Sequence, residues 1–320
     1  MTRHRQICTK IAKSIMALGC LCTIGSQRLA AQTDPLYSQY QFNMLAINPA
    51  YAGSRDMMSL LMLSRNQWVG FDGAPVTQSF TAHSPFFTNY TSAGLSVTRD
   101  KVGPMSQTLM FADYAFRFRI SPQAKLSLGL KAGFNNLKVD YNSLERTPGS
   151  NDPAYETGIM TKLMPNFGFG AYLHHPSYYF GFSIPRLVEN NFADQDNGNA
   201  VLSGRESRNY FLMGGAIFSL HNDFKLKPSI LVRIAEALPI TTDLNLNLLY
   251  ADKLWTGVMF RPQSAWGAVI QYQFIPQLKL GYAIEFTTND LQSVNNGTHE
   301  FMLLYEFYFK KNKVFSPRYF

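Results

Sequence analysis

The chain has 320 residues, of which 46% are apolar, 14% aromatic and only 16% charged. Low charge together with many Phe and Tyr residues favours a β-rich protein over a helical one. The formal charge of +8 does not indicate a nucleic-acid partner, because five basic residues and no acidic residue lie within the first 31 positions. The remainder carries 24 basic and 21 acidic residues, so its charge is nearly balanced.

The first 31 residues have the pattern of a Sec-type signal peptide. A basic start over residues 3–13 is followed by an apolar run over 15–24 and by Leu29, Ala30 and Ala31. The apolar run is too short to cross a bilayer as a helix. We therefore expect export and cleavage after Ala31.

All three cysteines (Cys8, Cys20 and Cys22) lie inside this leader. The processed chain is therefore expected to contain neither a disulfide nor a zinc–thiolate site. A lipoprotein attached at Cys20 is a second interpretation, but the residues before it, Ala-Leu-Gly, match a lipobox poorly.

Residues 32–56 combine turn-forming and aromatic residues, with bends marked by Asn48-Pro49 and Ala52-Gly53. Irregular backbone does not lie in lipid, so we expect this segment either inside a barrel lumen, as a plug, or at the periplasmic mouth. It is then an interaction or gating element, or a cork that only stabilises the barrel. The expected units are a signal peptide (1–31), this amino-terminal segment (32–56), a barrel (57–310) and a short basic tail (311–320).

From residue 57 the chain alternates between strand-like runs and turns, and no stretch of 18 apolar residues follows the leader. This excludes a helical membrane protein and predicts an all-β fold, a single transmembrane antiparallel β-barrel of about 14 strands. We expect the strands over residues 57–68, 76–84, 92–102, 107–120, 124–139, 163–174, 177–185, 207–220, 224–234, 241–250, 254–262, 265–275, 278–286 and 298–310.

Alternation of residue type defines the two faces of these strands. In 124–134 the even positions are Ala, Leu or Phe and the odd positions are Lys, Ser or Gly, and both 265–275 and 278–286 alternate similarly. A soluble sheet on an apolar core shows this pattern too. A barrel of about 14 strands, however, encloses space, which suits a wet polar lumen and an apolar face toward lipid.

Charged residues on the strands are expected to point into the lumen. Asp113, Arg117 and Arg119 share one face of strand 107–120, and an arginine facing lipid costs about 2–4 kcal/mol at mid-bilayer. We therefore expect that face to be internal, with Asp113 paired to Arg117. The predicted lumen-facing charged residues are Asp113, Arg117, Arg119, Lys125, Lys131, Lys279, Glu285, Glu300 and Glu306.

Three long polar connections, 140–162, 186–206 and 287–297, all follow odd-numbered expected strands and therefore fall on one side of the barrel. In bacterial barrels the long loops are external and the short turns periplasmic. With the amino end in the periplasm, these three connections are expected on the outside.

Nothing in the chain points to catalysis. His174 and His175 are adjacent on an expected strand, so their rings face opposite sides and do not form a metal pair. The Gly-x-Ser-x-Gly elbow is absent, although a Ser/His lipase is a minor alternative. We expect a protein that is not an enzyme and that needs no cofactor.

A series of short motifs occurs in a fixed order: YSQYQFN, INPAYAG, RNQW and GAP within 37–75, then RDKVGP (99–104), LSLGLKAGF (126–134), PNFGFGAY (165–172), KPSILVR (227–233), GTHEFMLLYEF (297–307) and SPRYF (316–320). This order resembles the PorP/SprF family of outer-membrane barrels associated with type IX secretion in Bacteroidetes-like bacteria. The amino-terminal residues that carry the likeness are Tyr37, Tyr40, Asn48, Pro49, Tyr51, Gly53, Gln67 and Trp68.

The resemblance implies an outer-membrane component or accessory of the type IX secretion and gliding machinery. Such a protein is expected to act as a scaffold for export or surface anchoring of a cargo protein. Its partners are then outer-membrane lipid, periplasmic and outer-membrane secretion proteins, and the secreted cargo, with no nucleic acid. The alternative function is a porin-like channel for small solutes.

Overall fold

A computed structural model describes residues 35–86, 90–143, 158–192, 205–236 and 238–307. The expected signal peptide and the basic tail lie outside the described residues. The division of the chain into leader, amino-terminal segment, barrel and tail therefore stays a prediction.

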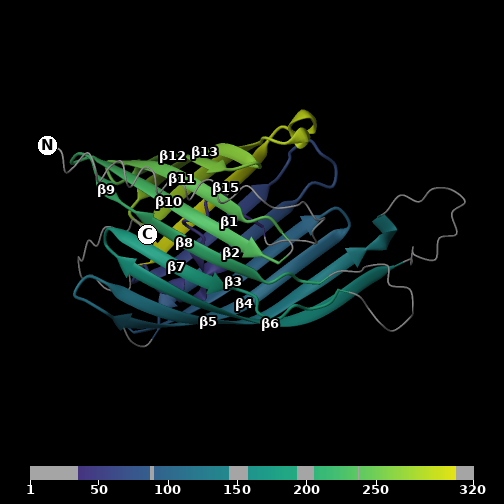
Figure 1. Ribbon diagram of the computed structural model, residues 1–320, viewed down its shortest axis with the longest axis horizontal. Helices are drawn as coiled ribbons and strands as arrows, with labels where there is room; N and C mark the ends of the chain where they lie inside the picture. The colour runs from purple at the N-terminus through teal and green to yellow at the C-terminus, as the bar shows by residue number, and fades with distance from the viewer. Residues whose placement is uncertain (1–34, 87–89, 144–157, 193–204, 237, 308–320) are drawn as a thin grey trace, which may run out of the picture.

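Antiparallel strands make up most of the described chain and close into a barrel (Figure 1). The strands are β1 (Met58–Asn66), β2 (Val76–Pro85), β3 (Thr91–Val102), β4 (Met105–Arg119), β5 (Lys125–Asp140), β6 (Ile159–His175), β7 (Tyr178–Ile184), β8 (Asn209–Ala216), β9 (Phe218–Ser219), β10 (Phe224–Ala235), β11 (Thr241–Tyr250), β12 (Leu254–Arg261), β13 (Ala265–Ile275), β14 (Leu278–Thr287) and β15 (Thr298–Phe307). Short helical turns are α2 (Met44–Ile47), η1 (Pro49–Tyr51), η2 (Tyr141–Ser143) and η3 (Asp290–Val294).

Closure leaves no free edge in the wall. The first strand, β1, pairs with both β2 and β15, and β10 pairs with β11. The two-residue β9 pairs with β10 beyond the end of β8, so it extends the line of β8 and the wall has 14 strands. The prediction of a closed barrel of about 14 antiparallel strands is confirmed. The expected strand 207–220 corresponds to β8 and β9 together, and β6 begins four residues earlier than expected.

The middle parts of β4 and β13 expose apolar side chains and bury the residues that alternate with them. In β4 the exposed positions include Tyr114, Phe116 and Phe118, whereas Asp113 and Arg117, on the other face, are buried. In β13, Trp266, Ala268, Ile270 and Tyr272 are likewise exposed. This arrangement is the reverse of a soluble sheet and fits a wall with lipid outside and polar side chains inside. Among the described residues, the helical segments are too short and too polar to span a bilayer.

The two ends of the barrel differ in the length of their connections. The connections between β5 and β6, between β7 and β8 and between β14 and β15 lie at one end, here called the loop end. Short turns, such as those between β6 and β7 and between β13 and β14, join the strands at the other end, here called the turn end. β1 begins and β15 ends at the turn end. The three long connections expected on one side of the barrel therefore do lie at one end.

Candidate functional site

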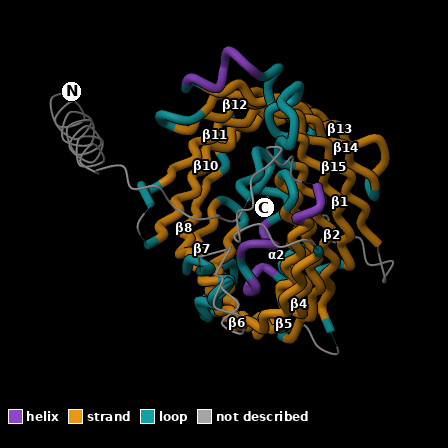
Figure 2. Tube along the Cα trace, turned by 90° about the vertical axis from the view of Figure 1, so that its right-hand side faces the viewer, coloured by secondary structure: helices purple, strands orange, loops and turns teal. Residues whose placement is uncertain are grey.

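The amino-terminal segment is buried although it contains no β-strand. Its apolar side chains are almost completely covered, with Tyr40 1% and Met44 0% exposed, and Figure 2 shows α2 within the ring of strands. Together with side chains from the buried faces of nine strands they form the main apolar cluster, whose members from the segment are Tyr37, Tyr40, Phe42, Met44, Leu45, Ile47, Ala50, Tyr51 and Ala52.

Asn48 sets the local shape of the segment. Its Oδ1 accepts a hydrogen bond from Ala50 N at 2.9 Å, and Pro49 occupies the first position of η1, which is the arrangement expected at the start of a helical turn. Its Nδ2 donates to the carbonyl oxygen of Ala171 in β6 at 3.1 Å. One side chain therefore both shapes the segment and attaches it to the wall.

Glycines in the wall make room for the segment. A Cβ at Gly129 would overlap the backbone of Ala50, and one at Gly170 would overlap the side chain of Asn48. Inward positions of other strands are also glycines with segment atoms within 4 Å of a Cβ: Gly94 beside Leu45, Gly181 beside Asn48 and Gly281 beside Gln39. The lumen is thus fitted to the segment by residues without side chains.

Gly129→Val is expected to displace η1 from the wall, because the new side chain needs the space of Ala50. In planar bilayers the variant should show leak currents that the native protein lacks, and protease should cut within residues 35–57. The matched control is Gly214→Val, since a Cβ at Gly214 makes only ordinary contacts at 3.6 Å or more. Equal leak from the two variants would contradict the assignment.

A buried ionic network joins the start of the segment to the wall near the loop end. The Arg65 guanidinium in β1 donates to Glu285 at 3.1 and 3.2 Å and lies 3.5 Å from Glu300. Glu300 accepts hydrogen bonds from the backbone N–H groups of Ser38 and Gln39 at 2.9 and 2.8 Å. Two further members extend it: Arg261 binds Asp243 at 2.5 Å and lies 3.3 Å from Glu285.

A second set of ion pairs holds the end of the segment at the turn end. Arg55 binds Glu306 of β15 at 2.5 Å, and both side chains are buried. Asp56 pairs with Arg117 at 2.5 Å and with Lys125 at 3.2 Å, and Arg117 also donates to the carbonyl oxygen of Gly53. Partial burial alone would raise the pKa of the Asp56 carboxyl. The positive charges of Arg117 and Lys125 together have the larger effect, so this pKa lies below its usual range.

Asp113 has a different partner from the one expected. It lies 3.3 Å from Lys131, which is directly opposite in the β4–β5 register, so the predicted Asp113–Arg117 pair is wrong. Arg117 is four residues further along β4, about 13 Å away, and binds Asp56 instead. Lys131 Nζ also donates to the carbonyl oxygens of Leu45 and Ala46 at 3.1 and 3.2 Å.

Aromatic rings of the wall and of the segment surround two lysines. Lys227 Nζ lies 5.5 Å from the ring centre of Phe42 and 5.4 Å from that of Trp255. Lys279 Nζ lies 4.8 and 5.3 Å from the same two rings. Phe42 therefore anchors the middle of the segment through cation–π contacts.

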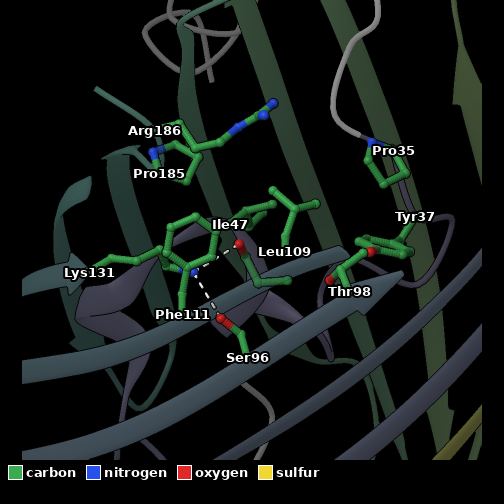
Figure 3. A pocket seen from close by; sticks show the side chains of 11 residues that line it. Pro35, Tyr37, Ile47, Ser96, Thr98, Leu109, Phe111, Lys131, Pro185 and Arg186 are labelled. Atoms are coloured by element: carbon green, nitrogen blue, oxygen red, sulfur yellow. Dashed lines mark hydrogen bonds between the residues drawn. The ribbon is translucent and has the colours of Figure 1, made fainter. Parts of the chain in front are cut away.

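The described residues of the connection after β7 are attached to the inner side of the wall near the loop end. Glu206 is 2% exposed and accepts hydrogen bonds from Asn135, Asn166, Arg186 and Asn190 at 2.6 to 3.1 Å. Those donors come from β5, from β6 and from the connection after β7, so one carboxylate attaches this connection to two strands of the wall. Between it and the segment lies a cavity of about 50 Å³ lined by Tyr37, Lys131 and Arg186 (Figure 3), with room for one or two water molecules.

The predicted residues fall into three places. Of the residues carrying the family likeness, the six from Tyr37 to Gly53 are buried in the segment, whereas Gln67 and Trp68 lie in the connection after β1. Of the predicted lumen-facing charges, Lys125 is half-buried beside Asp56 and Arg119 is exposed at the turn end. The others are buried: Asp113, Arg117, Lys131, Lys279, Glu285, Glu300 and Glu306.

Several members of the network were not anticipated from the sequence: Arg55, Asp56, Arg65, Lys227, Asp243 and Arg261. Arg65 and Glu300 are direct partners across β1 and β15. Apolar and polar residues alternate strictly in the last strand, which places Glu300 on the lumen face. The alternation in β1 is too weak to assign Arg65 to that face from the sequence. Among the described residues, no three His, Asp or Glu side chains gather in a way that would hold a metal ion.

Residues 29–305 match the family model described as type IX secretion system membrane protein PorP/SprF. The chain belongs to the PorP/SprF family. Family membership and the barrel together indicate that this PorP/SprF protein resides in the outer membrane and associates with type IX secretion machinery. No curated protein matches the chain.

Solved outer-membrane barrels resemble this PorP/SprF protein at low identity. A monoaromatic hydrocarbon channel, CymD, has a TM-score of 0.49 at 13% identity, covering 87% of this chain and 95% of its own. A Pseudomonas aeruginosa FadL homologue has a TM-score of 0.45 at 12% identity, with coverage of 82% and 94%. Acinetobacter baumannii Omp33 has a TM-score of 0.46 at 9% identity, with coverage of 78% and 98%.

Proposed function

We propose that this PorP/SprF protein is a protein-binding scaffold of the type IX secretion and gliding machinery, which supports export or surface anchoring of a cargo protein and carries out no covalent chemistry. The observation that supports this role is the filled interior. The segment 35–57 contributes apolar, polar and charged side chains to contacts with the wall. Its start is held by backbone hydrogen bonds to the buried Glu300, and its end by the buried Arg55–Glu306 ion pair. A barrel so filled offers its ends and its loops, rather than a pore, to other molecules.

The segment acts in this proposal as a plug that also responds to partners. Breaking a buried, hydrogen-bonded ionic contact is expensive because it leaves a buried charge unpaired, so release of the segment requires a partner that supplies an equivalent contact. Arg55, Asp56 and their partners lie at the turn end, which faces the periplasm in barrels of this kind, within reach of machinery proteins there. The competing function, passage of small solutes, requires an open path through the same interior.

Two measurements on the native protein test the proposal. Mild detergent extraction of outer membranes, with the protein tagged at a loop-end position, should recover secretion-machinery proteins together with the barrel. The purified barrel in planar bilayers should show no steady conductance. Steady conductance without co-purified machinery proteins would support the solute channel and overturn the scaffold.

A further inference from the structure

The amino-terminal segment runs along the barrel from one end to the other. It joins β1 at the turn end, where Asp56 binds Lys125 at the first residue of β5. At its other end, Pro35 lines the cavity with Leu109 and with Arg186, which follows β7 at the loop end (Figure 3). The two ends of the segment therefore contact opposite ends of the wall.

Contacts along single strands give the length of this path. On β4, Arg117 binds Asp56, whereas Leu109 lines the cavity of Pro35 eight residues closer to the loop end, about 27 Å along the strand. The apolar band of an outer-membrane barrel is roughly 25 Å tall and its strands are tilted by about 40°. The segment thus spans most of the thickness of the membrane.

Contacts on a second strand show the same order of segment residues along the barrel. On β14, Lys279 lies against the ring of Phe42, and Glu285, six residues and about 20 Å nearer to the loop end, accepts from Ser38 Oγ. Earlier residues of the segment therefore contact positions nearer to the loop end on both strands. Since long loops of bacterial barrels lie outside the cell and short turns lie in the periplasm, the direction of the path is from the cell surface at Pro35 to the periplasm at Asp56.

We infer that the start of the segment, at Pro35, lies at the cell-surface mouth of the barrel, and not in the periplasm as expected from the sequence, so that the segment runs through the lumen from the outside to the periplasm. With cleavage after Ala31, only residues 32–34 precede Pro35, and three residues extend at most about 10 Å. This inference does not depend on the scaffold role.

Single cysteines test the direction of the path, because the processed sequence contains no cysteine of its own. Pro35→Cys reports on the amino end, Gln292→Cys on the loop end and Asn222→Cys on the turn end; the last two positions are exposed. Intact cells and cells with a disrupted outer membrane are treated with a membrane-impermeant maleimide. A second version of the test inserts an epitope tag between Asp34 and Pro35 and measures antibody binding to the same two preparations.

The expected result is labelling of Pro35→Cys and Gln292→Cys on intact cells, labelling of Asn222→Cys only after disruption, and antibody binding to the tag on intact cells. Pro35 is half-buried, so a cysteine at this position can be unreactive in both preparations. In that case the result with the epitope tag is used instead. Binding of the tag only after disruption, with Gln292→Cys labelled on intact cells, would overturn the inference. Labelling of Asn222→Cys instead of Gln292→Cys on intact cells would also overturn it, by reversing the barrel. None of these outcomes bears on whether machinery proteins co-purify.

Discussion

Arg65→Met is expected to lower the free energy of unfolding of the barrel by about 3–5 kcal/mol, because it leaves Glu285 and Glu300 buried with too few positive partners. Methionine keeps much of the volume of the arginine stem, so the loss is mainly one of charge and hydrogen bonds. Ser38, whose Oγ also accepts from Arg65 at 3.1 Å, loses a contact as well. The start of the segment should therefore loosen together with the wall.

The measurement is unfolding of the protein in lipid vesicles, followed by loss of the compact band in unheated gel samples. Arg205→Met is the matched control, because Arg205 makes two ion pairs, with Glu189 and Glu236, while 55% of its side chain is exposed. Exposed pairs contribute at most about 1 kcal/mol. Adding Glu285→Gln and Glu300→Gln to Arg65→Met should recover part of the loss, since no buried charge then lacks its partner. Equal losses in the two arginine variants would show that the network contributes no more than a surface pair.

The barrel was predictable because lipid imposes a simple rule on each strand. Every second residue of 124–134, 265–275 and 278–286 is apolar, and those are the residues that face outward. Turn-forming residues separate the strands clearly, so most boundaries differ from the expected ones by one or two residues. The uncertain places were strands whose alternation is weak, such as 207–220, where Ile217 interrupts the line between β8 and β9.

The ionic partners were not predictable, because alternation gives the face of a residue but not its neighbour. Asp113 and Arg117 share a face, yet cross-strand register joins Asp113 to Lys131 and the segment brings Asp56 to Arg117. Both the β4–β5 register and the position of the segment arise only when the barrel closes. The sequence therefore indicates that the lumen is charged but not how its charges are paired.

One feature of the sequence is related to the position of the segment. Glycines occupy several inward positions, including Gly129 and Gly170, within the motifs LSLGLKAGF and PNFGFGAY. Read alone, such glycines indicate only a wall of small residues. Their contacts with Ala50 and Asn48 show that small wall residues and a bulky segment are two halves of one packing arrangement. The filling of the lumen therefore depends on the sequence of the strands, which provides the glycines, and on the sequence of the segment, which provides the bulky residues.

The outward face of β13 should tolerate arginine according to depth. Ile270 is at the centre of the strand and 50% exposed, whereas Phe274 is one residue from its turn-end limit and 56% exposed. Both positions face outward, so neither substitution disturbs the ionic network or the segment. Ile270→Arg is expected to cost about 2–4 kcal/mol of insertion free energy, and Phe274→Arg about 0–1 kcal/mol, because the charged head reaches water more easily near an interface.

The measurement is the amount of folded protein in the outer membrane of cells, together with the free energy of folding into lipid vesicles. Ile270→Met serves as the control for loss of the native side chain, since it keeps an apolar group of similar volume and should cost less than about 1.5 kcal/mol. Ile270→Arg should then be scarce in the membrane, while Phe274→Arg and Ile270→Met remain near the native level. If both arginine variants accumulated equally, the outward face of β13 would not lie across the apolar layer, and the apolar residues exposed on the neighbouring strands would need a protein partner rather than lipid to cover them.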